Sequence, residues 1–184
     1  MRHRKAILFV SFFIIVIVVV LFIPYRTALV FYEENTDHIE AFLPIKSGET
    51  FQIIFKHSIH LTDVVEKYIV TADHDIKQYE MVYEEFGIGM PSNAGPGETF
   101  AYEDGKYHLK DLDNYFSSMN IRNGKTVSEH RLIWESSNDD SSSEKEYMAW
   151  FNRYFEPGAW FTVQVERLSL WERLKGVKIH EGKQ

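Results

Sequence analysis

The chain has 184 residues, of which 45% are hydrophobic and 26% are charged, and its formal net charge is −7. This composition is typical of a globular protein with one domain of about 150 residues, and it excludes wholesale disorder and fibrous repeats. Because the sequence contains no cysteine, disulfides, thiolate metal sites, iron–sulfur clusters and cysteine nucleophiles are excluded.

The N-terminal segment is predicted to be a transmembrane helix. Residues 6–23 are apolar except for Ser11, and as a helix they would measure about 27 Å, close to the thickness of the hydrocarbon core of a bilayer. Basic residues cluster before this run, and only Arg26 follows it closely. The positive-inside rule therefore places the N-terminus in the cytoplasm and the remaining chain outside the cell membrane.

A cleaved signal peptide is the alternative reading of the same segment. Such peptides usually have a shorter apolar region that ends in a small-x-small cleavage site. Here the apolar run leads into Pro24, Tyr25 and Arg26, and a cut after Ala28 would place Arg26 where a small residue is needed. An uncleaved anchor is therefore the favoured interpretation.

The apolar segment divides the chain into three parts. We assign residues 1–27 to a signal anchor, residues 28–171 to an extracytoplasmic domain and residues 172–184 to a basic, peripheral tail. Residues 1–32 carry four Lys or Arg and no Asp or Glu, which leaves a formal charge of −11 on the remainder. An acidic domain repels nucleic acid, so no nucleic-acid partner is expected.

The extracytoplasmic domain is predicted to be all-β. From Ala28 onward the hydrophobic pattern has mostly a period of two, in runs rich in β-branched and aromatic residues that turn residues separate. This pattern indicates one β-sandwich or barrel-like domain. The predicted strands are 29–32, 38–43, 50–57, 64–71, 76–85, 99–102, 107–110, 119–122, 128–134 and 160–168.

The connections between these runs carry local signals. Asp104-Gly105 and Asn123-Gly124 are two-residue hairpin turns because both residue types tolerate positive φ, so 119–122 should pair with 125–134. Residues 136–146 contain no apolar side chain and predict a mobile loop. Aromatic residues at helical spacing then predict a short helix over 146–155, which Pro157-Gly158 would end.

Residues 53–70 contain the main candidate site. A tight hairpin turning at Leu61-Thr62 would place His57 opposite Glu66, with their Cβ atoms about 5 Å apart on an otherwise apolar face. The pair is either a structural ion pair, the favoured reading, or a ligand-binding or proton-handling site. Ser58 lies on the opposite face from His57 and no G-x-S-x-G motif occurs, so a serine hydrolase is not expected.

Later segments add further candidates. The loop with Gly87, Gly89 and Pro91 is either a strand bend or a rigid surface that faces a ligand or partner, and it lacks the pattern of a nucleotide-binding loop. Arg122 could engage a carboxylate or be an exposed charge beside a turn. His130 could join the His57 site as a metal ligand, but no recognised ligand spacing supports this. We therefore assign no metal and no cofactor.

Several segments together resemble the domain of unknown function 1850 family. The resemblance covers most of residues 38–169, in which the order and spacing of the motifs agree throughout. The segments are FKHSIHLTDVVEKYIV (55–70), FGIGMPS (86–92), FAYEDGKYHL (100–109), MNIRNG (119–124), EHRLIW (129–134) and PGAWFTVQVERLS (157–169).

The resemblance places the family's His, Ser and downstream Glu on His57, Ser58 and Glu66, and its Gly-x-Gly-x-Pro loop on residues 87–91. The sequence departs from the family at His60, where a Glu is usual. The family consists of small bacterial proteins whose genes tend to lie beside TAXI-type TRAP transporters. It thus implies a role in the uptake of organic acids.

The resulting expectation is a membrane-anchored, non-enzymatic accessory protein that contacts the TRAP permease or the TAXI solute-binding subunit. It would do so through the loop of residues 87–91 and the surface near His57. Two alternatives remain. One is an extracytoplasmic module that binds or senses a small molecule, and the other is a metal-assisted surface hydrolase using His57, Glu66 and His130.

Overall fold

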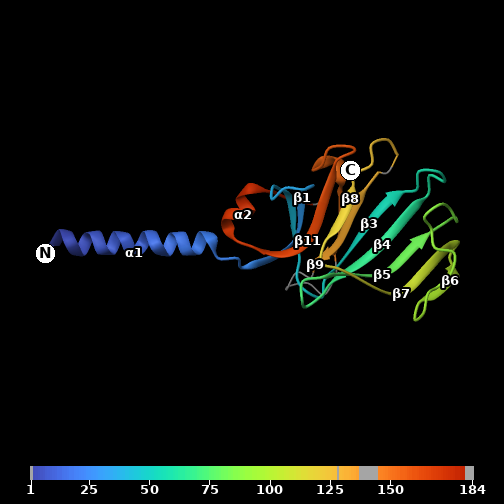
Figure 1. Cartoon of the computed structure of the whole chain (residues 1–184), viewed down its shortest axis with the longest axis horizontal. Helices are drawn as coiled ribbons and strands as arrows, with labels where there is room; N and C mark the ends of the chain where they lie inside the picture. Colours follow the sequence, from blue (N-terminus) through green and yellow to red (C-terminus); the bar gives the residue numbers. More distant parts are fainter. Residues whose placement is uncertain (1, 128, 137–144, 181–184) are drawn as a thin grey trace.

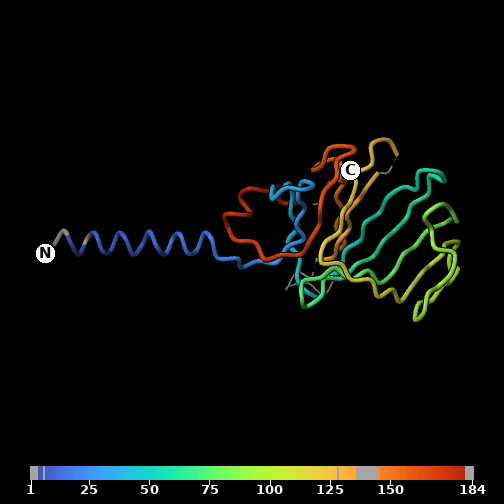
Figure 2. The backbone as a smooth tube through the Cα atoms, viewed as in Figure 1, coloured from blue at the N-terminus to red at the C-terminus, as the bar shows by residue number. Residues whose placement is uncertain are grey.

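The computed structural model describes residues 2–127, 129–136 and 145–180 (Figures 1 and 2). Within these residues, a smaller sheet has five strands in the order β12-β2-β1-β11-β8, and a larger sheet has seven in the order β10-β9-β3-β4-β5-β7-β6. The strands of the smaller sheet are β1 (Arg26–Glu33), β2 (Ile39–Pro44), β8 (Met119–Arg122), β11 (Trp160–Leu168) and β12 (Val177–Lys178). Those of the larger sheet are β3 (Thr50–Lys56), β4 (Asp63–Val70), β5 (Ile76–Tyr83), β6 (Thr99–Glu103), β7 (Lys106–Phe116), β9 (Arg131–Ser136) and β10 (Lys145–Trp150). The prediction of an all-β domain is confirmed.

One hydrophobic core joins the two sheets. Leu29 and Phe31 of β1 are fully buried against residues of the larger sheet. The intervening Val30 points the other way and packs with Phe42 and Leu168 in a second, smaller cluster. This alternation follows from the period of two in a strand that is covered on both faces. The smaller sheet therefore lies between the main core and this second cluster.

The N-terminal helix α1 (Arg2–Phe22) projects away from the sheets, as Figure 1 shows. Its apolar side chains from Ile7 to Val20 are exposed, from 41% at Val16 to 70% at Leu8. Among the described residues, no helix combines the length and the apolar character needed to cross a membrane.

The Asp104-Gly105 hairpin is confirmed, but two other local predictions are wrong. The turn joins β6 to β7 with positive φ at both residues. By contrast, β8 pairs with β11, while β9 pairs with β3 and β10, so Asn123-Gly124 links the two sheets instead of closing a hairpin. Asn123 is buried. Its side-chain Nδ2 group is satisfied there by donating to Asn152 Oδ1 and to two backbone carbonyl oxygens, at 2.9 to 3.1 Å.

The helix predicted over residues 146–155 is also wrong. β10 pairs with β9 along residues 145–150, and only one 3-10 turn, η1 (Phe151–Arg153), follows. Aromatic residues favour strands as well as amphipathic helices, and pairing with β9 overrides their helical spacing. The predicted mobile loop between these strands falls mostly on residues 137–144, outside the described residues.

The C-terminal segment is not peripheral, contrary to expectation. After β11, helix α2 (Leu170–Lys175) follows, and β12 then pairs in parallel with β2. Ile179 is 3% exposed and belongs to the main core. Gly176 permits this return, since a Cβ there would lie 2.5 Å from Ile39 Cγ2.

Candidate functional site

The predicted pairing of His57 with Glu66 is wrong. Glu66 lies opposite Ile53, so the β3–β4 register differs by four residues from the predicted one. The strand β3 ends at Lys56, and a wider turn follows in which the His57 N–H donates to Thr62 O at 2.9 Å. Because the shift is an even number, Glu66 stays on the apolar face of β4, as predicted.

His57 instead supports the glycine loop. Its Nδ1 faces the backbone N–H groups of Ile59 and His60 at 3.3 and 3.4 Å, and its Nε2 lies 3.2 Å from Ile88 O. An Nδ1 that accepts leaves the proton of the neutral ring on Nε2, which then donates to the loop carbonyl. The imidazoles of His57 and His60 stack with their centroids 5.0 Å apart.

Glycine is needed at positions 87 and 89 of this loop for two different physical reasons. A Cβ at Gly87 would lie 2.7 Å from His60 Nε2, so the stacked imidazoles require a glycine there. Gly89 has a φ of +89°, which glycine adopts at low cost. Pro91 accepts a hydrogen bond from the Tyr83 hydroxyl through its carbonyl oxygen. The candidate loop is thus bound to β5 and to His57, while Ser58 is exposed to solvent.

Three other predicted residues do come together. Glu66 from β4, Arg122 from β8 and His130 line one groove of about 430 Å³, and His57 does not. The groove opens where β8, the edge of the smaller sheet, lies over the wider sheet, whose strands β5, β7 and β6 extend further (Figure 1). The other lining residues are Ile53, Phe55, Tyr68, Gln78, Phe116, Ser118, Met119, Asn120 and Ile121.

Glu66 is a half-buried carboxyl group, and the described residues provide no cationic partner for it. Burial raises its pKa, and a 2.8 Å hydrogen bond from the Tyr68 hydroxyl acts in the opposite direction. Across the described residues, no Lys, Arg or His forms an ion pair with it. Burial and the neighbouring carboxyl also raise the pKa of Tyr68, so its hydroxyl remains a donor. A desolvated carboxyl of this kind favours its protonated form.

His130 is a neutral hydrogen-bonding group. Burial lowers its pKa from 6.5 to about 4, and its ring stacks between Phe55 and Phe151 with centroid distances of 5.5 and 5.4 Å. Its Nδ1 accepts from the Gly124 N–H at 3.5 Å. The proton of the neutral ring therefore sits on Nε2, which is left as a donor.

Arg122 and Gln78 add polar groups from two further strands. The Arg122 guanidinium is exposed and lies 5.7 Å from the centre of the Trp160 ring, an arrangement that holds its position by a cation–π contact. Gln78 is 7% exposed, and its Oε1 accepts from Asn114 Nδ2 at 3.2 Å. Polar groups from both sheets thus line the groove beside apolar side chains such as Phe55 and Ile121.

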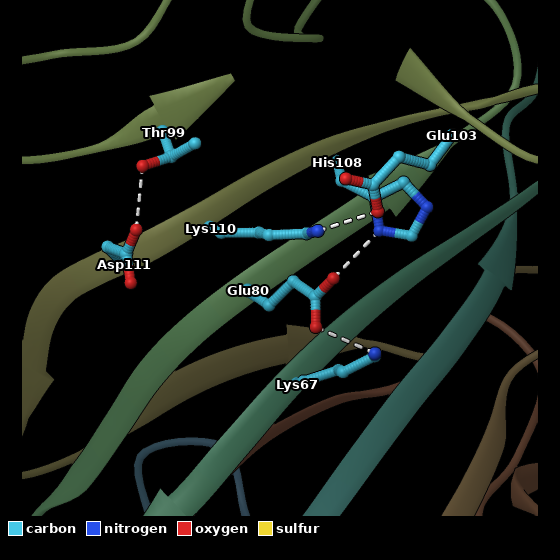
Figure 3. Close-up of polar contacts among 7 residues, drawn as sticks. All are labelled: Lys67, Glu80, Thr99, Glu103, His108, Lys110 and Asp111. Carbon is cyan, nitrogen blue, oxygen red and sulfur yellow. Dashed lines mark hydrogen bonds and ion pairs between the residues drawn. The ribbon is translucent and has the colours of Figure 1, made fainter. Parts of the chain in front are cut away.

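On the opposite face of the larger sheet, carboxylates form ion pairs with basic side chains. There Glu80 accepts from Lys67 at 2.7 Å and from His108 at 2.8 Å, while Lys110 pairs with Glu103 at 2.6 Å (Figure 3). Partial burial acts to raise the pKa of Glu80, but these hydrogen bonds lower it below its usual value. Glu80 and Glu103 each have a cationic partner, which distinguishes them from Glu66 on the inner face.

Sequence reasoning missed Tyr68 and Gln78. Tyr68 could have been found, because it is two residues from Glu66 on the same strand face. Gln78 reaches the groove through a register shift between β4 and β5, which no local sequence pattern predicts. No group of three or more His, Asp or Glu side chains in the described ranges is placed to hold a metal ion. The three residues of the hydrolase hypothesis do not meet either, since His57 is absent from the groove.

The comparisons with known proteins agree with the motifs. Residues 51–140 match the family described as a domain of unknown function (DUF1850). No curated protein and no solved structure is significantly similar to the chain. The matched segment carries the His57 turn, the glycine loop and three of the groove residues discussed above, Glu66, Arg122 and His130. The match over residues 51–140 confirms the resemblance to the domain of unknown function 1850 family.

Proposed function

We propose that this protein is a membrane-attached module that binds a small organic acid in the groove lined by Glu66, Arg122 and His130. The observation that carries the proposal is a half-buried carboxyl group with a raised pKa, which has no cationic partner among the described residues and lies beside a neutral imidazole and a guanidinium. A volume of about 430 Å³ lies in the range of small-molecule sites.

The chemistry of the groove favours a carboxylate ligand. When Glu66 carries a proton, its carboxyl group and His130 Nε2 both donate hydrogen bonds to the ligand, and Arg122 supplies the positive charge at the rim. The apolar side chains around them, among them Phe55 and Ile121, would contact the hydrocarbon part of the ligand. A ligand with one anionic end and a short apolar body matches this distribution.

Thermal unfolding with a panel of short-chain carboxylic acids and their amides tests this function. A cognate acid at one hundred times its Kd should raise Tm by on the order of 5–10 °C, and its amide should not. Arg122→Gln should weaken binding about tenfold, whereas Arg167→Gln, at an exposed arginine outside the groove, should not. Equal shifts with acids and amides, or none with any acid, would contradict the proposal.

A second experiment isolates the proton on Glu66. The affinity for the acid should fall as the pH rises through the pKa of Glu66, because two carboxylates then repel each other. Glu66→Gln keeps a neutral donor and should bind with no such dependence. If the wild-type protein and this variant show the same pH profile, Glu66 is not the group that selects the ligand.

Attachment to the cell membrane through α1 is the second part of the proposal. It is supported by the apolar side chains along α1, which the β domain leaves exposed, and by the basic residues before them, which favour a cytoplasmic N-terminus. Since the chain lacks cysteine, Ser92→Cys introduces one exposed thiol. Labelling of this thiol on intact cells by an impermeant maleimide is expected, and labelling only after lysis would contradict the orientation.

The family resemblance supplies the biological setting of the proposal. A ligand-binding module outside the membrane could deliver organic acids to a TAXI-type TRAP transporter, by contact with its permease or its solute-binding subunit. Co-purification from detergent-solubilised membranes tests this partner. Recovery of the protein without any transporter subunit, while the permease stays intact, would contradict the assignment.

A further inference from the structure

The end of α1 is joined to the β domain beside α2. The Tyr25 N–H donates to Leu168 O at 3.2 Å, directly before α2 begins. The rings of Phe22 and Trp171 lie 5.8 Å apart, and Figure 1 shows α2 next to the end of α1. The last turn of α1 and helix α2 are therefore adjacent and share the same surroundings.

Helix α2 has a defined position. Its N-terminus carries a capping box, in which the buried Ser169 accepts from the Glu172 N–H and Glu172 in turn accepts from the Ser169 N–H at 2.7 Å. The Arg173 guanidinium lies 5.8 Å from the centre of the Phe42 ring on β2. Gly176 then brings the chain against Ile39. The outward residues of α2 are thus presented by a fixed element.

The outward residues are apolar to an unusual degree. Trp171 is 44% exposed, Leu174 is 69% exposed and Val177, just after the helix, is 58% exposed. Tyr25, at the foot of α1, is 47% exposed. Together with the end of α1, these residues make up the exposed apolar surface that we call the α2 face. Exposed apolar residues that cluster in this way mark a surface covered by a partner.

Basic groups accompany these aromatic residues. Arg173 donates to the Tyr25 hydroxyl at 2.6 Å, and Lys175 Nζ lies 5.6 Å from the centre of the Trp171 ring. Tyr and Trp beside Arg and Lys are the residues that populate the headgroup layer of a bilayer, where apolar rings meet lipid phosphates. Residues 33–184 together carry a formal charge of −11, so this positive charge is local.

We infer that the α2 face rests in the headgroup layer of the membrane that α1 enters, an inference that relies on the proposed attachment of α1. Its aromatic and aliphatic side chains lie at the level of the acyl-chain boundary, and the exposed Lys175 faces the lipid phosphates. The β domain is then held against the bilayer in one orientation. Trp160 lies at the other end of β11, about 26 Å from Leu168 along the strand, and so far from α2.

Tryptophan quenching by lipids with brominated acyl chains tests the inference on the full chain. All four tryptophans lie in the β domain, at residues 134, 150, 160 and 171, and α1 has none. In vesicles of brominated phosphatidylcholine, most of the quenching should come from Trp171. Trp171→Phe should reduce it several-fold. Trp160→Phe is the matched control, because Trp160 is equally exposed, at 45%, and should leave the quenching unchanged.

Co-sedimentation with the same vesicles distinguishes the contact of the α2 face with lipid from the attachment of α1 to the membrane. If the protein sediments with vesicles but Trp171→Phe leaves the quenching unchanged, the inference is overturned and the attachment of α1 stands. If the protein does not sediment, both are overturned. Leu174→Glu gives a second reading, since this side chain is 69% exposed and its replacement should not affect folding. The variant should stay bound to the vesicles and lose most of its quenching.

Discussion

The half-buried imidazole of His130 should make the stability of the domain depend on pH between about 4 and 6.5. Burial lowers its pKa from 6.5 to about 4, so in this interval the unfolded chain binds more protons than the folded one. The unfolding free energy therefore falls as the pH is lowered through this interval and levels off below it. Each pH unit is worth about 1.4 kcal/mol, so the loss amounts to about 3 kcal/mol. Solvent in the open groove makes this an upper bound.

His130→Phe removes the titrating group and keeps an aromatic ring between Phe55 and Phe151. Urea unfolding followed by tryptophan fluorescence, at pH 7 and at pH 4, gives the unfolding free energy of both proteins in the same detergent. Carboxylates and the other histidines titrate in both, so their contributions cancel in the comparison. The wild-type protein should lose up to about 3 kcal/mol more than the variant on acidification.

His38→Gln is the matched control, because His38 is exposed. This variant should lose the same free energy on acidification as the wild-type protein. If wild type and His130→Phe instead lose equal amounts, the His130 ring is not held neutral by burial. The donor assigned to its Nε2 in the groove would then be wrong as well.

Three further predictions concern single residues. Tyr68→Phe removes the hydrogen bond that lowers the pKa of Glu66, so this pKa should rise further in a carbon-13 NMR titration. Asn123→Ala leaves the three oxygen acceptors of its buried amide without their donor. It should lower the unfolding free energy in urea by about 2–3 kcal/mol. Asn120→Ala, at an exposed position, should lower it by about 0.5 kcal/mol or less. Gly87→Ala should displace the two stacked imidazoles of the turn, which their NMR chemical shifts would report; unchanged shifts would refute the contact.

Local patterns predicted the strands well and their partners poorly. Alternation of apolar and polar residues located β3, β4 and β5 and the inward face of Glu66, because the period of two is a local property of an extended chain. The register of β3 against β4 depends on the width of the turn that joins them. Leu61 has a φ of +58° in that turn, a backbone geometry that a leucine in the sequence does not predict. The register predicted from a tight hairpin was therefore wrong by four residues.

The errors at 119–134 and 146–155 have a common cause. An Asn-Gly pair and a helical spacing of aromatic residues are real preferences, but each is worth only a fraction of the free energy gained by packing a strand into a sheet. β8 gains more by pairing with β11 than by turning back on β9, and β10 gains more as a partner of β9 than as a helix. Such choices are made between segments far apart in the sequence.

The candidate site divides in the same way. The sequence by itself determined the residue types, the family and the face on which Glu66 lies, because these follow from neighbours a few positions away. Only the tertiary structure decided that His57 would support a loop, and that Glu66, Arg122 and His130 would line one groove. These three side chains come from segments of two different sheets, and their meeting depends on how the edge strand β8 lies across the wider sheet, which no local pattern encodes.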